Sequence, residues 1–238
     1  MGVRKAMLTA VAVIAALVCS AAVAGSLGMK VVNIDWLNNI RDAVRITQVS
    51  VAGKNVPLGE FALHLEGRDG TPFEADDDWL KNMTITLKNR TDKVIVCAEI
   101  TLWFPETKGA NPDHPNATAA YMIKVGQRPA SALYHRDGSK IPPDTANKPV
   151  VFAPGQTLVI PIADYVDEIQ SQVEGVGNTA FSHITKLNIQ RNLFYFIDGT
   201  TWAVDSYFAP DPEHPGNYTR LPDNYFPGHL VSSGKTGE

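Results

Sequence analysis

Short runs in which apolar and polar residues alternate, separated by proline and glycine, limit this chain to a fold built from strands. In "NMTITLKN" (82–89) every second residue is apolar, which is the pattern of a strand with one buried face. The next run, "KVIVCAEITLWF" (93–104), has apolar residues on both faces, so we expect it to be covered partly on both sides. Pro105 ends this strand because proline has no N–H to continue a ladder.

Five further runs are also rich in β-branched and aromatic residues and are bounded by turn residues. They cover 45–51, 120–126, 156–162, 185–197 and 200–208. Many short strands separated by proline and glycine turns predict an all-β sandwich.

Two segments have helical patterns. In "DYVDEIQSQVEG" (164–175), Asp164 is the expected cap, apolar residues recur at helical spacing, and Gly175 is the expected end. The pattern of "DWLNNIRDA" (35–43) also permits a short helix. We therefore expect one or two short helices beside the strands.

The aromatic-rich stretch "NLFYFIDGTTWAVDSYF" (192–208) predicts a hairpin. With Asp198-Gly199 as a two-residue turn, Tyr195 faces Trp202 across the strands. Asp205 would then lie about 20 Å from Asp198, since a strand rises ~3.3 Å per residue. That separation is too large for the carboxylate pair of a glycosidase, where the two groups lie at most ~9.5 Å apart.

The first residues predict export. A short basic start is followed by an apolar run (6–18) and by Ala22-Val23-Ala24 before Gly25, which together form a secretory signal peptide over residues 1–24. The apolar run is shorter than the ~20 residues that span a bilayer. We expect a secreted or periplasmic protein with no stable membrane insertion after cleavage.

The composition of the mature chain excludes several classes of protein. Cys97 would be its only cysteine, so no intrachain disulfide could form, and its apolar setting predicts an inert buried thiol. Without Arg4 and Lys5 the chain has 19 Lys and Arg against 25 Asp and Glu, a net charge of −6. A mildly acidic chain without a basic run is a poor binder of nucleic acid and of anionic membranes.

A series of short motifs resembles a group of uncharacterised secreted bacterial proteins. The motifs are "DDDWLKNMTITLKN", "LWFPET", "GQRPAS", "APGQTLVIPI" and "FYFIDGTTWAVDSYFAPDP", which share the W-L-K, F-P-E-T and F-x-D-G-T-x-W patterns of that group. The resemblance covers roughly residues 45 to 220. It implies an immunoglobulin-like antiparallel β-sandwich and brings no known activity and no catalytic residues.

We divide the chain accordingly into four parts. These are a signal peptide (1–24), an N-terminal segment with the short helix (25–44), the β-sandwich domain (45–208) and an irregular C-terminal tail (209–238).

Familiar catalytic motifs are missing from the sequence. It contains no G-x-S-x-G, H-E-x-x-H, phosphate-binding or EF-hand pattern, so we expect no cofactor, no metal and no catalytic residue. One coincidence stands out, because "NPDHPNAT" (111–118) and "DPEHPGNYT" (211–219) both contain Pro-acid-His-Pro. The candidate binding residues from these loops are Asp113, His114, Glu213 and His214.

Alternating strand directions place both loops at the same end of the expected sandwich. This tracing assumes that each run, including 200–208, crosses the sandwich once. The candidate contact surface is then the end formed by 105–119, the 164–174 helix and the tail after Phe208.

We interpret the chain as a non-catalytic binding or structural module whose unknown partner is a protein or a carbohydrate. The first alternative is a metal-assisted hydrolase that uses His114 and His214. The second is a carbohydrate-binding module, which would expose aromatic side chains such as Trp103, Phe194 or Phe196 on one face.

Overall fold

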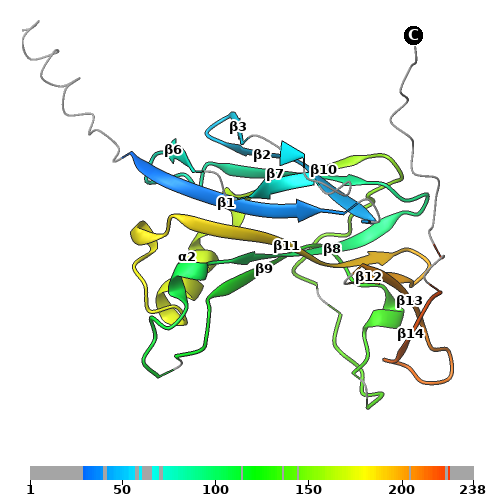
Figure 1. Ribbon diagram of the computed structural model, residues 1–238. Helices are drawn as coiled ribbons and strands as arrows, with labels where there is room; N and C mark the ends of the chain where they lie inside the picture. Colours follow the sequence, from blue (N-terminus) through cyan, green and yellow to red (C-terminus); the bar gives the residue numbers. More distant parts are fainter. Residues whose placement is uncertain are drawn as a thin grey trace, which may run out of the picture.

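The computed structural model shows a mostly β protein with two sheets packed face to face (Figure 1). It describes residues 29–39, 42–56, 59–60, 66–69, 72–113, 115–135, 137–143, 145–203, 205–222 and 225. The predicted signal peptide lies outside the described residues.

The smaller sheet has the strand order β10-β7-β2-β3, and all its pairings are antiparallel. Its strands are β2 (Val44–Val51), β3 (Lys54–Val56), β7 (Met83–Asn89) and β10 (Thr157–Pro161). The alternating runs 45–51, 82–89 and 156–162 therefore form strands as predicted, because each buries one face against the second sheet.

The larger sheet has the order β14-β13-β12-β11-β1-β5-β4, with β8 also paired to β11, β9 paired to β8, and β6 paired to β1. Its strands are β1 (Lys30–Asn38), β4 (Gly59–Glu60), β5 (Glu66–Asp69), β6 (Phe73–Ala75), β8 (Ile95–Trp103), β9 (Ala120–Gly126), β11 (Lys186–Phe196), β12 (Thr201–Ala203), β13 (Ser206–Pro210) and β14 (Tyr218–Arg220).

Strand β1 corrects two expectations. Residues 35–38 belong to this strand and not to a helix, because Trp36 packs into the core while Asp35 and Leu37 point away from it. Strand β1 also runs parallel to β11, with Trp36 opposite Ile189, so the larger sheet is not purely antiparallel. The N-terminal segment is consequently part of the sheet.

The hydrophobic core fills the space between the two sheets. Its largest fully buried side chains include Trp79, Trp202, Phe104, Phe194 and Phe196. The indole of Trp79 also donates a hydrogen bond to the carbonyl of Ile184 at 3.2 Å, so its only polar atom is satisfied inside the protein.

One α-helix, α2 (Val166–Gly175), occurs in the described part of the chain, and it packs beside β9. Its apolar residues Ile169 and Val173 are buried, as the helical spacing predicts. Asp164 is not its cap, because that residue belongs to a preceding 3₁₀ turn, η4 (Ile162–Tyr165). The other 3₁₀ turns are η2 (Pro105–Thr107), η3 (Ala130–Ala132) and η5 (Phe181–His183).

The hairpin at Asp198-Gly199 exists, but its register differs by one residue from the prediction. Phe194 faces Trp202, and Gly199 N–H donates to the carbonyl of Phe196 at 3.0 Å. The loop is therefore the three-residue type, in which only Gly199 has a positive φ, +85°. The two-residue turn would have required a positive φ at Asp198 as well.

A second hairpin follows where a single strand was expected over 200–208. Trp202 pairs with Tyr207 and Ala203 with Ser206, so β13 runs back along β12. Asp205 has a φ of +60°, and an aspartate tolerates this left-handed conformation without glycine. The chain after Phe208 therefore starts beside the Asp198 turn, where Pro210 lies against Gly199.

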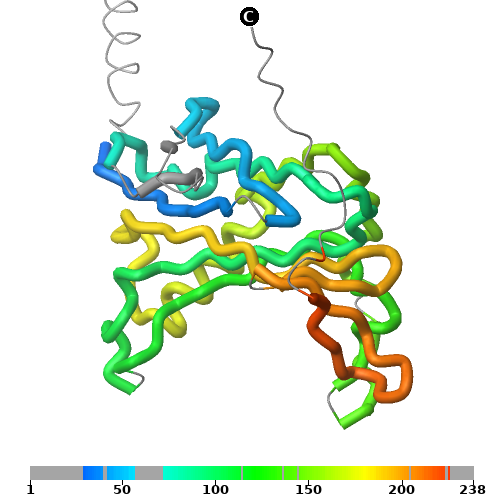
Figure 2. The backbone as a smooth tube through the Cα atoms, turned by 45° about the vertical axis from the view of Figure 1, so that its right-hand side comes forward, coloured from blue at the N-terminus to red at the C-terminus, as the bar shows by residue number. Residues whose placement is uncertain are grey.

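Two protrusions extend from the larger sheet, one at each end, and give the molecule the outline of an arch (Figure 2). The first contains the 105–119 loop next to the end of α2, with Asn111 bonded to the carbonyl of Val176 at 3.1 Å. The second contains 127–149 and the β13–β14 connection. The tail is thus not irregular throughout, because β14 extends the sheet.

Candidate functional site

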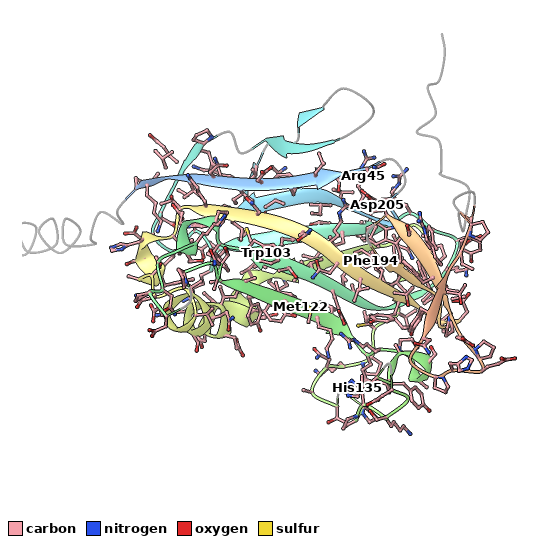
Figure 3. The ribbon with its side chains drawn as sticks, turned by 60° about the horizontal axis from the view of Figure 1, so that its bottom comes forward. Arg45, Trp103, Met122, His135, Phe194 and Asp205 are labelled. Carbon is pink, nitrogen blue, oxygen red and sulfur yellow. The ribbon has the colours of Figure 1, made fainter. Side chains whose placement is uncertain are left out.

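The outer face of the larger sheet, between the two protrusions, carries the candidate site. We call the exposed surface of β1, β11, β8 and β9 the arch face, and Figure 3 views the molecule from this side. Trp103 is 38% exposed there, whereas Trp36, Trp79 and Trp202 are at most 3% exposed. Leu37 and Met122 are also exposed on this face, so Trp103 belongs to a group of exposed apolar side chains there.

Two neighbouring segments fix Trp103 in place. Its indole N–H donates to Oε1 of Gln190 on β11 at 2.8 Å. On its C-terminal side, Phe104 is buried and Pro105 begins the 3₁₀ turn η2. The side chain is therefore held on the arch face by a strand, a turn and one hydrogen bond.

Glu106 in the same turn joins it to β11. Its carboxylate accepts hydrogen bonds from the N–H of Thr185 at 2.8 Å and from the N–H of Lys186 at 2.9 Å. Thr107 Oγ1 in turn accepts from the N–H of Ala119 at 2.7 Å. The F-P-E-T motif is consequently structural: it closes the end of β8 and aligns β11 beside Trp103.

Register brings three side chains of different chemistry into one row on the arch face. Asp35 of β1 is opposite Asn188 of β11, and Asn188 is opposite Trp103 of β8. Side chains at directly opposed positions point to the same face of a sheet. The row therefore combines a carboxylate, an amide and an indole over three adjacent strands.

A shallow groove of about 390 Å³ follows this row. Its side-chain walls come from Asp35, Leu37, Trp103, Asn188 and Gln190, while Trp36 and Ile189 contribute from the strands beneath. Apolar walls with a few convergent polar groups are typical of small-ligand sites.

The other half of the arch face is polar. Glu99 is fully buried, and Nε of Arg128 donates to its Oε1 at 2.7 Å. The same guanidinium lies 5.5 Å from the ring centre of Tyr195, and burial raises the pKa of that phenol. Arg128 belongs to the 127–149 loop, so these contacts attach the second protrusion to the sheet, and the Arg128 guanidinium stays partly exposed.

The Pro-acid-His-Pro loops lie on different protrusions. Asp113 is in the first protrusion, where its N–H bonds to Oδ1 of Asn111 at 2.9 Å, and His114 lies outside the described residues. Glu213 and His214 are in the second protrusion, where Nδ1 of His214 lies 3.0 Å from Oδ2 of Asp211. The hairpin at Asp205 reverses the last strand, and this reversal separates the two loops.

The contact surface expected from sequence is therefore divided. The 105–119 loop and α2 are neighbours. The side-chain amide of Asn178, which follows α2, donates a hydrogen bond to the carbonyl of Ala110 at 3.1 Å. The tail loop instead approaches residues 134–138, because an added Cβ at Gly216 would lie 2.0 Å from the carbonyl oxygen of His135. Tyr218 and Tyr225 of the tail pack on the sandwich.

Of the aromatic residues considered for a carbohydrate-binding face, Trp103 alone is exposed. Phe194 and Phe196 are both fully buried, and the ring centres of Phe194 and Trp202 lie 5.5 Å apart in a tilted arrangement. Cys97 is buried as predicted. Arg191, which interrupts an apolar run, turns inward to the carboxylate of Asp42.

Sequence reasoning missed Asp35, Asn188 and Gln190. The signal was present as alternation: in "KLNIQ" (186–190) the polar residues fall on one face, and in "VVNIDWL" (31–37) Asp35 and Leu37 alternate with buried residues. What the sequence could not provide was the parallel register that joins these two segments.

Comparisons of this chain with family models, with curated proteins and with solved structures gave no match. Within the described residues, no three His, Cys, Asp or Glu side chains gather in a way that could hold a metal ion. The helices in that same part of the chain are each too short or too polar to cross a bilayer.

Proposed function

We propose that this chain is an exported, non-catalytic binding module, and that the arch face around Trp103 is its binding surface. The observation that carries the proposal is the exposure of Trp103 on a strand in a protein that buries its other three tryptophans. Exposed aromatic side chains held rigidly on a scaffold are typical of recognition surfaces, because they bury a large area at little cost in conformational entropy.

We further propose that the sandwich is immunoglobulin-like. Support comes from the strand orders β2-β7-β10 in one sheet and β9-β8-β11-β12 in the other. If β2, β7, β8, β10, β11 and β12 are strands A, B, C, E, F and G, these orders are A-B-E and C-F-G with one added edge strand. The N-terminal β1 is an addition that forms one border of the arch face.

The composition of the groove favours binding over catalysis. Asp35 is the only ionisable side chain among the groove-lining residues that the structure describes. Hydrolysis by general acid and base needs two positioned groups that exchange a proton, and the described lining supplies one carboxylate beside two amides. The same groups are well suited to hold a ligand by hydrogen bonds.

Export can be tested separately from binding. We expect N-terminal sequencing of the mature protein, isolated from outside the cytoplasm, to begin at Gly25. A mature chain that still begins at Met1, or one that begins at a lipidated Cys19, would contradict the assignment.

The binding surface can be tested by the indole N–H signals of the four tryptophans in a nitrogen-15 NMR spectrum. Trp103→Phe identifies the signal of Trp103. The probes are cellohexaose, hexagalacturonate and an extended hexapeptide of mixed sequence. We expect at least one probe class to shift the Trp103 signal while the three buried indoles stay in place.

Val159→Ala is the matched control, because Val159 is an exposed apolar residue on the outer side of the other sheet. It should leave the response unchanged. Binding of a probe without movement of the Trp103 signal, or no binding by any probe class, would overturn the proposal that the arch face is the binding surface.

A further inference from the structure

We propose that the open edge of β9, which is the side of this strand away from β8 at the rim of the arch face, binds an extended segment of a partner protein as an additional strand. This inference rests on the proposed binding function and adds the kind of partner and its mode of binding. Three features of the molecule support it: the edge itself, the protrusions at its two ends and the charge of α2.

Strand β9 is the longest edge strand in the described part of the chain. It has seven residues and pairs there with β8 alone, whereas the edge strands β3, β4, β6, β10 and β14 have at most five. Proteins usually protect a long edge with proline, a bulge or a covering segment, because its free N–H and C=O groups pair readily with another strand. Strand β9 contains no proline, and its pairing with β8 has no bulge.

The register shows which backbone groups of β9 face the open edge. Just before the strand, the N–H of Phe104 donates to the carbonyl of Ala119 at 3.0 Å. Backbone groups alternate between the two sides of an antiparallel strand, so the odd-numbered residues of β9 bond to β8 and the even-numbered residues face outward. The backbone groups of Ala120 and Met122 therefore point to the open edge, and neither residue has a backbone hydrogen bond to another described residue.

The side chain of Met122 favours apolar residues on one side of an added strand. It is 48% exposed on the arch face, opposite Thr101 and diagonal to Trp103 on β8. Alternate side chains of an added strand would lie beside Met122 and Ala120 on this face. Apolar side chains are favoured there, because they bury the exposed surface of Met122.

The two protrusions limit what can reach the edge. Strand β9 begins directly after the 105–119 loop and ends directly before the 127–149 loop, so a protrusion borders each end. Both protrusions extend past β9 on its open side (Figure 1 and Figure 2). If a second copy paired through its own β9, the protrusions of the two copies would collide before the edges reached the ~4.8 Å spacing of paired strands. A single extended segment avoids this collision.

Helix α2 gives the other side of the edge a negative charge. Together with the preceding turn η4 it contains Asp164, Asp167, Glu168 and Glu174 and no lysine or arginine. Burial raises the pKa of the Tyr121 phenol and the charge of Glu168 raises it further, so this carboxylate lies near β9. In an added strand the residue opposite Tyr121 would point to this side, where a basic side chain is favoured. We expect a segment in which apolar and basic residues alternate.

The probe is a heptapeptide with blocked ends in which valine alternates with lysine. Isothermal titration measures its affinity, and hydrogen exchange followed by NMR measures the protection of the β9 amides. We expect saturating peptide to slow exchange at Ala120 and Met122 by at least about 10-fold, whereas the amides of Tyr121 and Ile123 are already protected by β8 in the free protein.

Two altered peptides serve as controls. A peptide that is N-methylated at its valines keeps the side chains but loses the amide donors that face the edge. A peptide in which glutamate replaces lysine keeps the backbone but reverses the charge that faces α2. We expect each of them to bind at least about 10-fold more weakly than the valine-lysine peptide.

Met122→Pro tests the edge on the protein itself. The N–H of Met122 does not bond to β8, so proline removes an edge donor without breaking the ladder. We expect it to weaken binding about 10-fold or more, and Met122→Ala, which keeps the N–H, to weaken binding less. Val159→Ala should have no effect. Ile123→Pro should lower the melting temperature much more than Met122→Pro, because the N–H of Ile123 bonds to β8.

The outcomes distinguish strand addition from the proposed binding function. A probe that shifts the Trp103 signal, while the peptide leaves Ala120 and Met122 unprotected, would overturn strand addition and leave the binding surface supported. Equal affinity for the N-methylated peptide would also overturn strand addition, and it keeps the test valid if Met122→Pro does not fold. Equal affinity for the glutamate peptide would overturn the basic partner alone.

Two further outcomes would overturn more. Protection of Ala120 and Met122 in the free protein would show that this chain or a second copy already covers the edge, and it would exclude the partner segment. Failure of the heptapeptide and of all the probes named above to bind would overturn both strand addition and the binding surface.

Discussion

Arg191 and Asp42 form an ion pair inside the sandwich, at the border between its two sheets. Nη1 of Arg191 contacts Oδ2 of Asp42 and also donates to the carbonyl of Val44 at 3.0 Å, while Nη2 donates to the carbonyl of Leu37 at 2.6 Å. One guanidinium from β11 thus joins β1 to β2. Burial raises the pKa of the Asp42 carboxyl, and the charge of Arg191 opposes that effect.

Replacing Asp42 by alanine should destabilise the fold strongly. The substitution leaves the Arg191 guanidinium buried without its carboxylate, and such a loss costs about 3–5 kcal/mol. The free energy of unfolding from urea denaturation is the measurement. Asp77→Ala is the control, since Asp77 is half exposed and lies 3.6 Å from Lys30, and a surface pair contributes less than about 1 kcal/mol. Similar small losses in both variants would contradict the buried-pair assignment.

Local pattern was sufficient for the strands that bury one face. The runs 45–51, 82–89 and 120–126 lie within one residue of β2, β7 and β9, because alternation with period two records burial directly. The F-x-D-G-T-x-W motif also has local structural roles. Gly199 adopts the positive φ that its loop requires, and Asp198 forms an ion pair with Lys93.

Local pattern failed where long-range pairing decides the structure. Strand β1 is set by a parallel register with β11, more than 150 residues later, and its own alternation, in which Val32, Ile34 and Trp36 are buried, does not reveal that partner. No glycine or proline stands next to Asp205, so the sequence does not indicate the reversal there. Trp103 could be named from the sequence as an exposed aromatic candidate. Its polar neighbours could not, because they join the site only when β1, β11 and β8 are in register.

The reversal itself predicts a specific response to substitution at Asp205. A β-branched residue at a φ of +60° is strained by about 1–2 kcal/mol, while asparagine tolerates this conformation. We expect Asp205→Val to lower the free energy of unfolding by that amount and Asp205→Asn to change it by less than about 0.5 kcal/mol. A valine variant as stable as the asparagine variant would be incompatible with the turn.

The second protrusion predicts a difference between two glycines. Gly216 and Gly155 have φ values of +90° and +73°, so alanine brings backbone strain of about 1 kcal/mol at either position. Around Gly155 no atom lies within 4 Å of an added Cβ, whereas at Gly216 that Cβ would be 2.0 Å from the carbonyl oxygen of His135. Gly216→Ala should therefore cost at least about 1 kcal/mol more than Gly155→Ala in urea denaturation, because a fixed backbone must move. Equal losses would show that the two loops do not approach each other.

The contact between the tail and the sandwich predicts a dependence of stability on pH. Nζ of Lys93 lies 2.5 Å from Oδ2 of Asp198 and 2.7 Å from the hydroxyl of Tyr225. Burial alone would raise the pKa of Asp198, but the hydrogen bonds from Lys93 and Thr200 outweigh it, and the pKa is lowered. Burial would lower the pKa of Lys93, but its bonds to Asp198 and Tyr225 raise it.

These directions fix the two pH ranges in which stability is lost. A lowered aspartate pKa stabilises the fold above about pH 4, the unfolded value, and this contribution disappears as the pH falls through the folded pKa. A raised lysine pKa stabilises the fold below about pH 10.4, and this contribution disappears as the pH rises through the folded pKa.

Asp198→Asn should therefore destabilise the protein at neutral pH, and its difference in free energy of unfolding from the wild type should shrink at acid pH. In a Lys93→Met background the effect of Asp198→Asn should become small, since the two residues act as one pair. Urea denaturation of the four proteins at neutral and at acid pH measures both effects, and an Asp198→Asn effect that is the same at both pH values would exclude the ion pair as its cause.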